Sequence, residues 1–435
     1  MCCGKKLPEG STARKLCDLD ADARREYWAC LALRHCHGLG ARSVCCLLQH
    51  FGSAYAAVQG QAHWREAGLR SDMAQVLASN AWRTSARIEW DRACSLNAFV
   101  VFWKDPAYPP LLRRIVDAPP LLYCRGDISL LQTPCFAVVG ARKATEHGLT
   151  VAKHMAHCLA AYGLTIVSGM ALGIDRIAHE AALHGVGRSI GVLGTGIDMA
   201  YPRQNMSLFE AMESSGLLVS EFAPGTPPQA CNFPIRNRII SGLSLGVLVV
   251  EAADRSGSLI TARLALEQNR DVYAVPGPAL DAHCLGSQEL VRQGAQAVFC
   301  AEDILRDLAE QLRHYGISMA NLSQKMKEAS GVGRHISATE HDTKNAAGSY
   351  VQQPKDDRRP AATLPSGELA AVQQLTASDD TATILRYLCV NGPTQSDVLA
   401  NAAGLSASAT NTVLIGLEML GQVRRLPGAR YEAVT

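Results

Sequence analysis

The sequence lacks the motifs of several common nucleotide and metal sites. It has no Gly-x-Gly-x-x-Gly fingerprint in the first strand-to-helix turn and no Gly-x-x-x-x-Gly-Lys-Ser/Thr loop. NAD and ATP binding of the usual kinds are therefore disfavoured. No Cys-x-x-Cys pair occurs, and His35-Cys36-His37 has no second ligand pair nearby. We expect neither a cofactor nor a bound metal.

The sequence also lacks a long hydrophobic run and a strong charge of either sign. No apolar stretch reaches the length of about 18 residues that a membrane span needs, and the N-terminus has no signal-peptide core. Lys and Arg number 42 against 40 Asp and Glu, a formal net charge of +2. This balance excludes a purely polybasic nucleic-acid binder but allows a focused basic patch. We expect a cytoplasmic protein without a membrane contact.

The cysteines do not have the pattern of a disulfide scaffold. There are 15 in a chain of 435 residues. This odd number is spread along the whole chain, and several cysteines lie in apolar segments. Reduced core thiols are the better interpretation. A chain of this length predicts two or three domains.

The first hundred residues predict a polar leader, 1–24, followed by a helical domain, 25–100. Within that domain, Leu33–Val44 contains Gly38-Leu39-Gly40 between two apolar, helically spaced stretches, which resembles a helix-hairpin-helix. Two interpretations stay open: the turn contacts a DNA backbone, or it only packs the helical domain. A proline-punctuated connector, including Asp105–Leu112 and Ala118–Tyr123, follows and cannot be helical throughout.

The segment 101–313 predicts an extended Rossmann-like domain with a doubly wound, mostly parallel sheet. Apolar runs alternate with helical stretches such as Gly148–Tyr162 and Ile174–His184. In such a fold, ligands bind beyond the carboxyl ends of the strands. The expected strands are Phe136–Gly140, Thr165–Ser168, Ser189–Gly194, Leu217–Glu221, Val247–Glu251 and Val272–Val275.

The C-terminal part predicts a flexible linker, 314–380, and a winged-helix domain, 381–435. Apolar residues are sparse in the linker. Three helical stretches and a hairpin signal at Pro427–Arg430 follow. A winged helix reads DNA or contacts proteins. Because its would-be recognition helix has few basic residues, we favour a protein contact or weak DNA binding.

The expected strands end in small and polar residues that should meet along one sheet edge and form an anion site. Gly140 lets a backbone approach closely, and Arg142 and Lys143 can neutralise a phosphate. The turn Ser256–Thr261 leads into a helix whose amides suit phosphates. The segment Phe233–Ser244 sets two arginines among apolar residues, so we expect it to pack on one side and present cations on the other.

These clusters favour holding a phosphodiester over breaking one. We cannot assemble a metal-binding carboxylate group or a Ser/His/Asp set from them. Asp175 and Asp198 are candidate catalytic acids, but we prefer them as structural caps of their loops. Phe233 is a candidate to stack on unpaired bases, with Tyr201 as a second one, and such stacking holds single strands without sequence readout. The alternative is that Phe233 belongs to the core.

Several motifs in order resemble the DprA/Smf family of bacterial DNA-processing proteins, from about Pro109 to Phe299. The motifs are Gly140-Ala141-Arg142, Ser168-Gly169-Met170-Ala171-x-Gly173-Ile174-Asp175-x-x-Ala178-His179, Gly196-Ile197-Asp198-x-x-Tyr201-Pro202-x-x-Asn205, Phe233-Pro234-x-Arg236-Asn237-Arg238-Ile239-Ile240-Ser241-Gly242-Leu243-Ser244, Ser256-Gly257-Ser258-Leu259-Ile260-Thr261-Ala262 and Ala274-Val275-Pro276-Gly277.

The resemblance implies a non-enzymatic, cytoplasmic protein that binds and protects single-stranded DNA. It also implies a homodimer that helps to load the RecA recombinase, in natural transformation (competence) or in DNA recombination. By that analogy Arg142, Phe233, Arg236 and Arg238 line the DNA channel, while Ser168, Gly169 and the turn Ser256–Thr261 meet phosphates. The full set of expected DNA contacts is Gly140, Arg142, Lys143, Ser168, Gly169, Phe233, Arg236, Asn237, Arg238, Ser241, Ser256, Gly257, Ser258 and Thr261.

Two departures and two rival functions complete these expectations. Ala141 stands where the family often has Ser, and Gly286–Val291 differs from the commoner pattern, which puts any role of that late loop in doubt. One rival is a phosphoribohydrolase-like nucleotide-processing enzyme, but the catalytic loop of that class is missing at Glu251–Ser258. The other is an adaptor whose central site is vestigial.

Overall fold

The computed structural model describes residues 14–278, 281–317, 379–405, 409–410, 413–414, 417, 422–426 and 430–433. They belong to two compact units, Met1–Ala338 and Thr339–Thr435. The predicted linker, 314–380, lies almost wholly outside the described residues.

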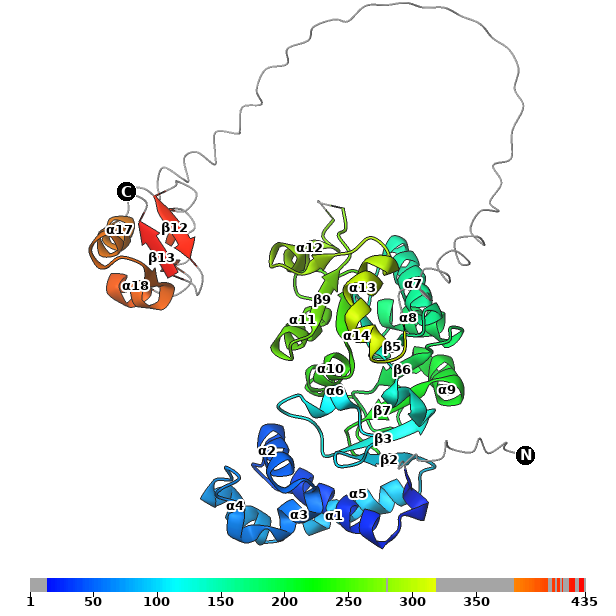
Figure 1. Ribbon diagram of the computed structural model, residues 1–435. Helices are drawn as coiled ribbons and strands as arrows, with labels where there is room; N and C mark the ends of the chain where they lie inside the picture. The colour runs from blue at the N-terminus through cyan, green and yellow to red at the C-terminus, as the bar shows by residue number, and fades with distance from the viewer. Residues whose placement is uncertain are drawn as a thin grey trace, which may run out of the picture. The chain divides into compact units, whose positions relative to one another are not determined.

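The first unit is built on one large sheet (Figure 1). In the described part of the chain this sheet has ten strands in the order β1-β2-β3-β7-β6-β5-β4-β8-β9-β10. The strands from β4 to β10 run parallel, whereas β1, β2 and β3 extend the β7 edge antiparallel. Their bounds are β1 Arg14–Lys15, β2 Phe99–Phe102, β3 Leu121–Gly126, β4 Cys135–Val139, β5 Thr165–Ser168, β6 Ser189–Val192, β7 Leu217–Ser220, β8 Gly246–Val249, β9 Asp271–Ala274 and β10 Gln296–Ala297.

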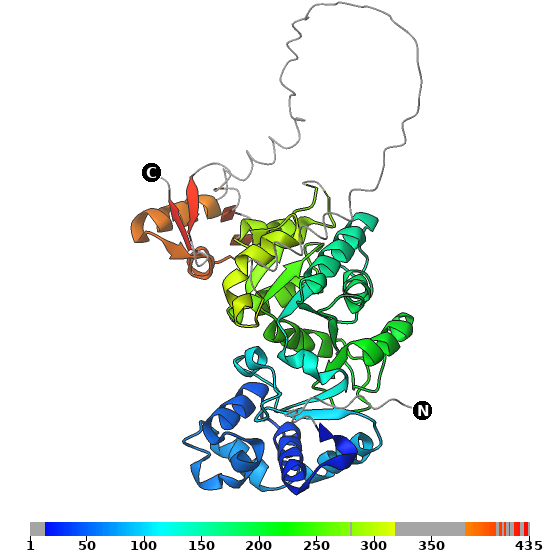
Figure 2. The same cartoon turned by 45° about the vertical axis from the view of Figure 1, so that its right-hand side comes forward.

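Helices cover both faces of the parallel part, as the doubly wound prediction requires (Figures 1 and 2). Apolar side chains of α7, α8, α13 and α14 pack on one face, and those of α6, α10, α11 and α12 on the other. The bounds are α6 Pro110–Arg113, α7 Glu146–Ala161, α8 Ile174–Leu183, α9 Met206–Ser215, α10 Asn232–Leu243, α11 Gly257–Glu267, α12 Leu285–Arg292, α13 Ala301–Asp307 and α14 Ala309–Arg313.

All six expected strands are present, within two residues at either end. Their apolar runs are buried on both faces, as is typical of strands in a parallel sheet. The sequence did not predict two further strands, β2 and β3, which pair with each other on either side of the connector, with β3 overlapping the connector's end. The connector's prolines, at 106, 109, 110, 119 and 120, lie in the short helix and loops between these strands.

The N-terminal helical region does not form a unit of its own. Its helices are α1 Ala21–His35, α2 Ala41–Phe51, α3 Ala54–Gln59, α4 Ser71–Ala78 and α5 Arg83–Cys94. The core that contains Tyr27 of α1 continues into Phe102 of β2, Tyr123 of β3 and Phe209 of α9. Gly38 has a φ of 82° in the tight turn between α1 and α2, so the predicted hairpin turn is present.

The prediction of a polar leader over 1–24 is wrong for its described part. Arg14 and Lys15 form β1 and pair with β2. Leu16 and Leu19 are buried in the core beside α1. Two leucines among charged residues are too few to show in a hydropathy pattern, yet they are enough to dock the segment.

The second unit contains the predicted winged helix. Its described elements are α17 Asp379–Asn391, β11 Thr394–Gln395, α18 Ser396–Ala403, β12 Val423–Leu426 and β13 Arg430–Ala433. The strands form a small sheet in the order β11-β13-β12. Arg424 pairs with Glu432 on the neighbouring strand, and the hairpin tip, 427–429, lies outside the described residues.

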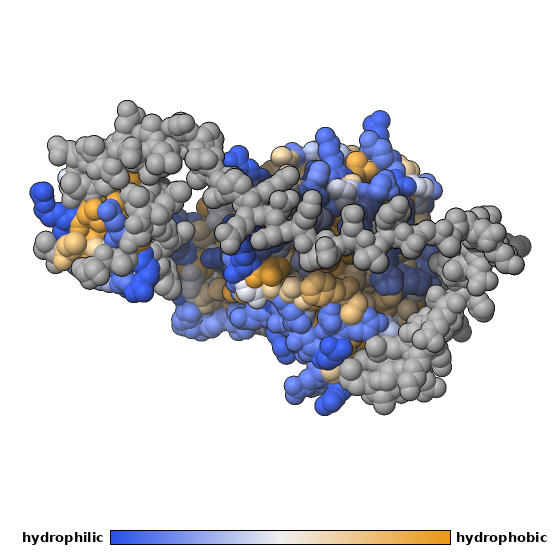
Figure 3. Space-filling model, turned by 90° about the horizontal axis from the view of Figure 1, so that it is seen from above, coloured by the Kyte–Doolittle hydropathy of each residue, from blue (hydrophilic) through white to orange (hydrophobic). Residues whose placement is uncertain are grey.

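The cysteines of the described residues and their surface complete the description of the fold. All cysteines in the described ranges are free thiols, and many are buried, which confirms the reduced-thiol interpretation for them. Within the described residues no helix is both long and apolar enough to span a bilayer. Hydrophilic side chains cover most of the described surface visible from above, with hydrophobic side chains in small patches (Figure 3).

The docked N-terminal segment gives a stability prediction. Leu16→Ala should lower the free energy of unfolding by about 2–5 kcal/mol, because it leaves a cavity in a packed core. Leu266→Ala, at a leucine that is 58% exposed, is the matched control and should change it by less than about 0.5 kcal/mol. Urea unfolding followed by circular dichroism measures both. Equal, small effects would show that the segment is a loose leader after all.

A candidate nucleic-acid site at the switch point of the sheet

The candidate site lies where the chain changes direction in the sheet. Strands β4 and β8 are parallel neighbours, but β4 leads into α7 on one face and β8 leads into α11 on the other. The connections therefore diverge and leave a crevice at the carboxyl ends of the two strands. An open cleft of about 770 Å³ occupies this position, lined by residues that follow β4 and β8 and by the start of α10.

The floor of the cleft includes the N-terminus of α11. Ser256 precedes the helix, and its Oγ accepts a hydrogen bond from the Ser258 N–H at 3.4 Å. Gly257 is exposed, with open space where a side chain would stand. Thr261, one turn further on, also lines the cleft. A helix N-terminus with an uncovered backbone is a favourable place for a phosphate.

Cations dominate the lining. The described lining residues carry four cationic side chains, Arg142, Lys143, Arg236 and Arg255, and one carboxylate, Asp175. Arg142, Lys143 and Arg255 are exposed. Within the described residues, none of these three has a carboxylate at ion-pair distance. Their charge is available to an anion in the cleft.

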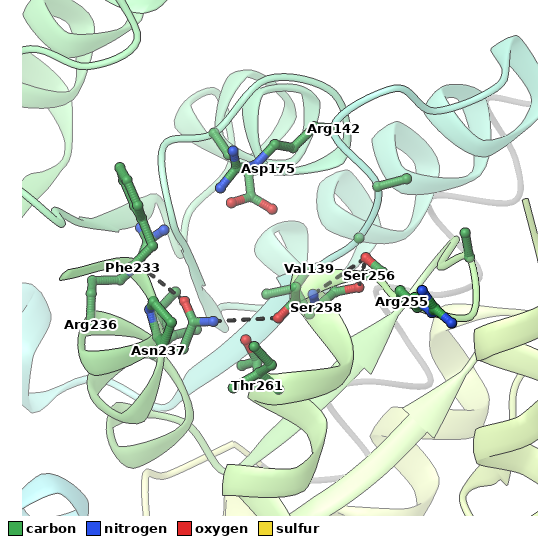
Figure 4. A pocket seen from close by; sticks show the side chains of 18 of the residues that line it. Val139, Arg142, Asp175, Phe233, Arg236, Asn237, Arg255, Ser256, Ser258 and Thr261 are labelled. Carbon is green, nitrogen blue, oxygen red and sulfur yellow. Dashed lines mark hydrogen bonds between the residues drawn. The ribbon is translucent and has the colours of Figure 1, made fainter. Parts of the chain in front are cut away.

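Phe233 is an aromatic residue in the first turn of α10. It is half-buried, with its ring 5.6 Å from the Tyr201 ring and 5.6 Å from the Arg142 guanidinium. In Figure 4, Phe233 and Asn237 of α10 face Ser256, Ser258 and Thr261 across the hollow, with Arg142 and Asp175 above them. Phe233 therefore belongs to the wall of the cleft and not to the core.

Arg236 is a structural arginine at the base of the cleft. Arg236 is only 4% exposed. Its Nη1 donates to the carbonyl oxygens of Gly169 and Val192, and its Nε donates to Asn237 Oδ1 at 3.2 Å. Burial lowers the pKa of Arg236 to about 10, although the nearby Asp175 carboxylate opposes the shift. The expectation of an exposed, DNA-facing guanidinium is corrected: most of its donors are already used.

Arg238 and Ser241 do not line the cleft. Arg238 Nη2 donates to Glu221 Oε2 at 2.6 Å, and Arg238 Nε lies 3.4 Å from Asp117 Oδ2. Ser241 is fully buried, and its Oγ donates to backbone carbonyls of its own helix. The structure therefore does not bring these two predicted contact residues to the cleft. The segment expected to expose one side is a helix buried almost all round beyond Ile235.

The loop after β5 is a rigid support and not a phosphate cradle. The Gly169 N–H donates to Asp175 Oδ2 at 3.1 Å, and Ser168 Oγ donates to the Val138 carbonyl. Both predicted phosphate contacts are thus occupied internally. The Met170 N–H donates to His179 Nε2 at 3.3 Å, while Asn205 Nδ2 donates to the Met170 carbonyl at 2.8 Å. Gly169 still borders a small side hollow next to Phe233.

The two aspartates hold loops, in agreement with the preferred interpretation. Asp175 receives the hydrogen bond from Gly169, and Asp198 Oδ1 accepts one from the Gly225 N–H at 2.8 Å. Gly173, which starts α8, has a φ of 74°, and a side chain there would collide with the carbonyls of Ala141 and Arg142. Only glycine lets the loops after β4 and β5 approach each other this closely.

The N-terminus of α7 is closed to ligands by a carboxylate of the protein itself. Glu251, at the end of β8, is buried, and its Oε2 accepts from Thr145 Oγ1 at 2.7 Å. Glu251 also accepts from the Thr145 N–H, the N-cap residue of α7. In a dinucleotide-binding fold this helix end receives the pyrophosphate. Its occupation agrees with the missing glycine fingerprint.

Of the fourteen residues expected to contact DNA, ten line the cleft. They are Gly140, Arg142, Lys143, Phe233, Arg236, Asn237, Ser256, Gly257, Ser258 and Thr261. Sequence reasoning missed Arg255 and His283, which also line it. Arg255 carried a signal, since it directly precedes the small-residue turn into α11. The late loop before α12 brings His283 to within 3.9 Å of Glu251.

The fold and cleft define a class: Rossmann-like proteins with a cation-lined cleft at the switch point of a doubly wound sheet. The comparisons with known proteins make this specific. Residues 99–309 match the family model described as DNA recombination-mediator protein A, and residues 361–429 match the DprA winged helix domain.

Proteins similar to this chain point to the same family as the family models. The chain is 37% identical to the protein Smf of Synechocystis sp., covering 75% of this chain and 78% of that protein. It is 45% identical to the DNA processing protein DprA of Bacillus subtilis, covering 48% and 70%. The X-ray structure of DprA from Streptococcus pneumoniae superposes with a TM-score of 0.56 at 34% identity, covering 64% of this chain and 97% of that one. The chain belongs to the DprA/Smf family of DNA processing proteins.

The ion pairs of Arg238 give a prediction about the stability of the fold. Arg238→Ala leaves the Glu221 and Asp117 carboxylates without their cation, so the free energy of unfolding should fall by about 3–5 kcal/mol. Arg306→Ala, at a side chain that is 73% exposed, is the control and should have almost no effect. Urea denaturation decides. If Arg238→Ala is as stable as the control, the buried ion pairs do not hold α10 in place.

His179 predicts a pH dependence. Burial lowers its pKa from 6.5 to about 3, so below pH 6.5 the unfolded chain binds a proton that the folded chain does not. Stability is therefore lost as pH falls below 6.5. Between pH 7.5 and 5.5 the wild type should lose about 1.4 kcal/mol more than His179→Gln, which cannot titrate. His157→Gln, at an exposed histidine, should keep the wild-type slope. Parallel stability curves for the wild type and His179→Gln would contradict the assignment.

Proposed function

We propose that the cleft binds single-stranded DNA through its phosphates, without catalysis. The observation that carries the proposal is the set of exposed cations, Arg142, Lys143 and Arg255, placed around the N-terminus of α11. Guanidinium groups and helix amides both suit phosphate oxygens. Such contacts read no bases, so binding should tolerate any sequence and weaken with salt.

Phe233 supports a preference for single strands. Its ring lines the cleft between Arg142 and Tyr201. An aromatic ring beside arginines can stack on a base only when that base is unpaired and free to turn toward it. A duplex keeps its bases stacked inside and offers Phe233 no partner. Single strands should therefore bind more tightly than the same sequence in a duplex.

Binding fits the cleft better than hydrolysis does. The buried carboxylate of the cleft and the one that follows β8 already have structural partners: Asp175 accepts from the Gly169 N–H, and Glu251 accepts from Thr145. Burial raises the pKa of Asp175, with Arg236 opposing the shift. A phosphoribohydrolase-like reaction needs a carboxylate free to act on the substrate. We therefore favour a protein that holds and protects DNA.

The biological setting is proposed from the family. Its model is described as a DNA recombination mediator, which supports a role in loading the RecA recombinase on the bound strand, in natural transformation or in recombination. We further propose a homodimer in the cytoplasm. The adaptor alternative places recruitment in the winged helix, and it would gain if the cleft arginines proved dispensable for DNA binding.

The cleft cations give the test. Anisotropy of a labelled oligo-dT should show that Arg142→Ala and Arg255→Ala each weaken binding by about tenfold, a loss of about 1.4 kcal/mol. Each substitution should also reduce the slope of log affinity against log salt by about 0.7, the value for one lost single-strand phosphate contact. Both side chains are exposed, so neither variant should unfold.

Arg306→Ala, a surface arginine on α13, is the control and should bind like the wild type. Unlabelled duplex of the same sequence should compete poorly. Wild-type affinity and salt slope in both cleft variants would move DNA binding away from the cleft and favour the adaptor alternative.

A further inference from the structure

Three of the chain's five tryptophans gather on the surface of the helical region. Trp28 lies on α1 and Trp90 on α5, with their rings stacked 5.6 Å apart at 28°. Trp82 directly precedes α5, and its Nε1 donates to the Leu77 carbonyl at 3.3 Å. All three are half-buried. Trp28, Trp82, Arg83 and Arg87 line a hollow of about 440 Å³, which we call the tryptophan hollow.

The indole rings of the hollow are held in place before any ligand arrives. Trp90 packs edge-on against buried Tyr27 at 5.3 Å and supports one face of Trp28. The hydrogen bond to Leu77 fixes Trp82. All three rings pack against the core of the helical region, and their partial exposure leaves aromatic surface open beside the hollow. Rigid, partly exposed aromatic rings lose little entropy when they bind a flat partner.

The remaining lining of the hollow is cationic. Arg83 is exposed, and its guanidinium lies 5.6 Å from the centre of the Trp82 ring. Arg87 forms an exposed ion pair with Asp91 at 3.0 Å, a contact that solvent makes weak. The described lining contains no carboxylate. Indole faces beside guanidinium groups are the chemistry that holds an unpaired base and its phosphate.

Helix α5 connects the hollow to the neighbourhood of the cleft. Arg92, near its other end, reaches the loop at Gly225, and Pro228, three residues on, lines the cleft. Arg83 and Arg92 are about 14 Å apart along the helix axis, and three extended residues add about 10 Å at most. A strand of about eight nucleotides at 3.4 Å each covers this distance.

We propose that the tryptophan hollow is a second contact for the DNA strand that the cleft holds, binding an unpaired base between its indoles and a phosphate at Arg83. The inference rests on the proposed function of the cleft. It gives the helical region a part in strand binding that depends on strand length. A strand too short to leave the cleft does not reach the hollow.

The test compares two oligo-dT lengths, about 6 and about 25 nucleotides, by fluorescence anisotropy. Trp82→Ala and Arg83→Glu should weaken binding of the long strand at least fivefold, since one stacked base contributes about 1–3 kcal/mol, and leave the short strand unaffected. Arg83→Glu changes an exposed side chain, so it keeps the test valid if Trp82→Ala folds poorly. Arg70→Ala, an exposed arginine of the same region, is the control.

Each outcome decides the matter. If the wild type binds both strands and both hollow variants bind the long strand as tightly as the wild type does, the inference is overturned. The proposed function of the cleft then stands, and a protein becomes the alternative partner for the hollow. If the wild type binds neither strand, the proposed function of the cleft fails, and this inference fails with it. If the variants lose affinity for both lengths equally, the hollow does not act as a separate contact.

Discussion

The hydrogen bonds of the buried Arg236 guanidinium are the interaction on which the site depends. Its Nη1 joins the carbonyl of Gly169, just after β5, to that of Val192, at the end of β6. Because Arg236 belongs to α10, these bonds fasten the start of that helix to the carboxyl edge of the sheet. Phe233 and Asn237 take their positions from it. A charged group this deeply buried is stable only because its donors are satisfied.

The polar groups in and around the cleft fall into two sets, one buried with protein partners and one exposed. Buried groups such as Asp175 and Glu251 have protein partners and hold the loops against one another. Exposed groups, Arg142, Lys143 and Arg255, keep their charge for a ligand. The α7 N-terminus is capped by Glu251, whereas the α11 N-terminus opens into the cleft. Under the proposed function, this division leaves the exposed cations and the α11 N-terminus to meet the phosphates of an extended backbone.

The sequence predicted the parallel strands well, because a short apolar run such as Thr165–Ser168, bounded by turn residues, is typical of a strand buried on both faces. It also predicted most of the cleft, since small residues at strand ends must meet at one edge. It did not show which arginines are exposed. Arg236 and Arg238 are buried by partners far away in the chain, at Gly169, Val192, Glu221 and Asp117.

The other differences between the sequence predictions and the structure also arise from tertiary contacts. Prolines in the connector concealed β3, which pairs with β7 from a remote part of the sequence. Leu16 and Leu19 are isolated among polar residues, so their burial depends on a core built by other segments. Arg255 was missed although it directly precedes the small-residue turn into α11, because a single arginine in a loop is usually solvated. Periodicity detects an element, but only tertiary contacts decide which side chains that element exposes.

Photo-crosslinking tests most directly whether single-stranded DNA lies in the cleft beside Phe233. A single strand carrying 5-iodouracil forms a covalent bond to an aromatic ring that stacks on that base, and mass spectrometry of the digested complex locates it. The account predicts crosslinks on the peptide that contains Phe233, and their loss when unlabelled single strand competes. Crosslinks confined to the winged-helix residues 379–433 would contradict it.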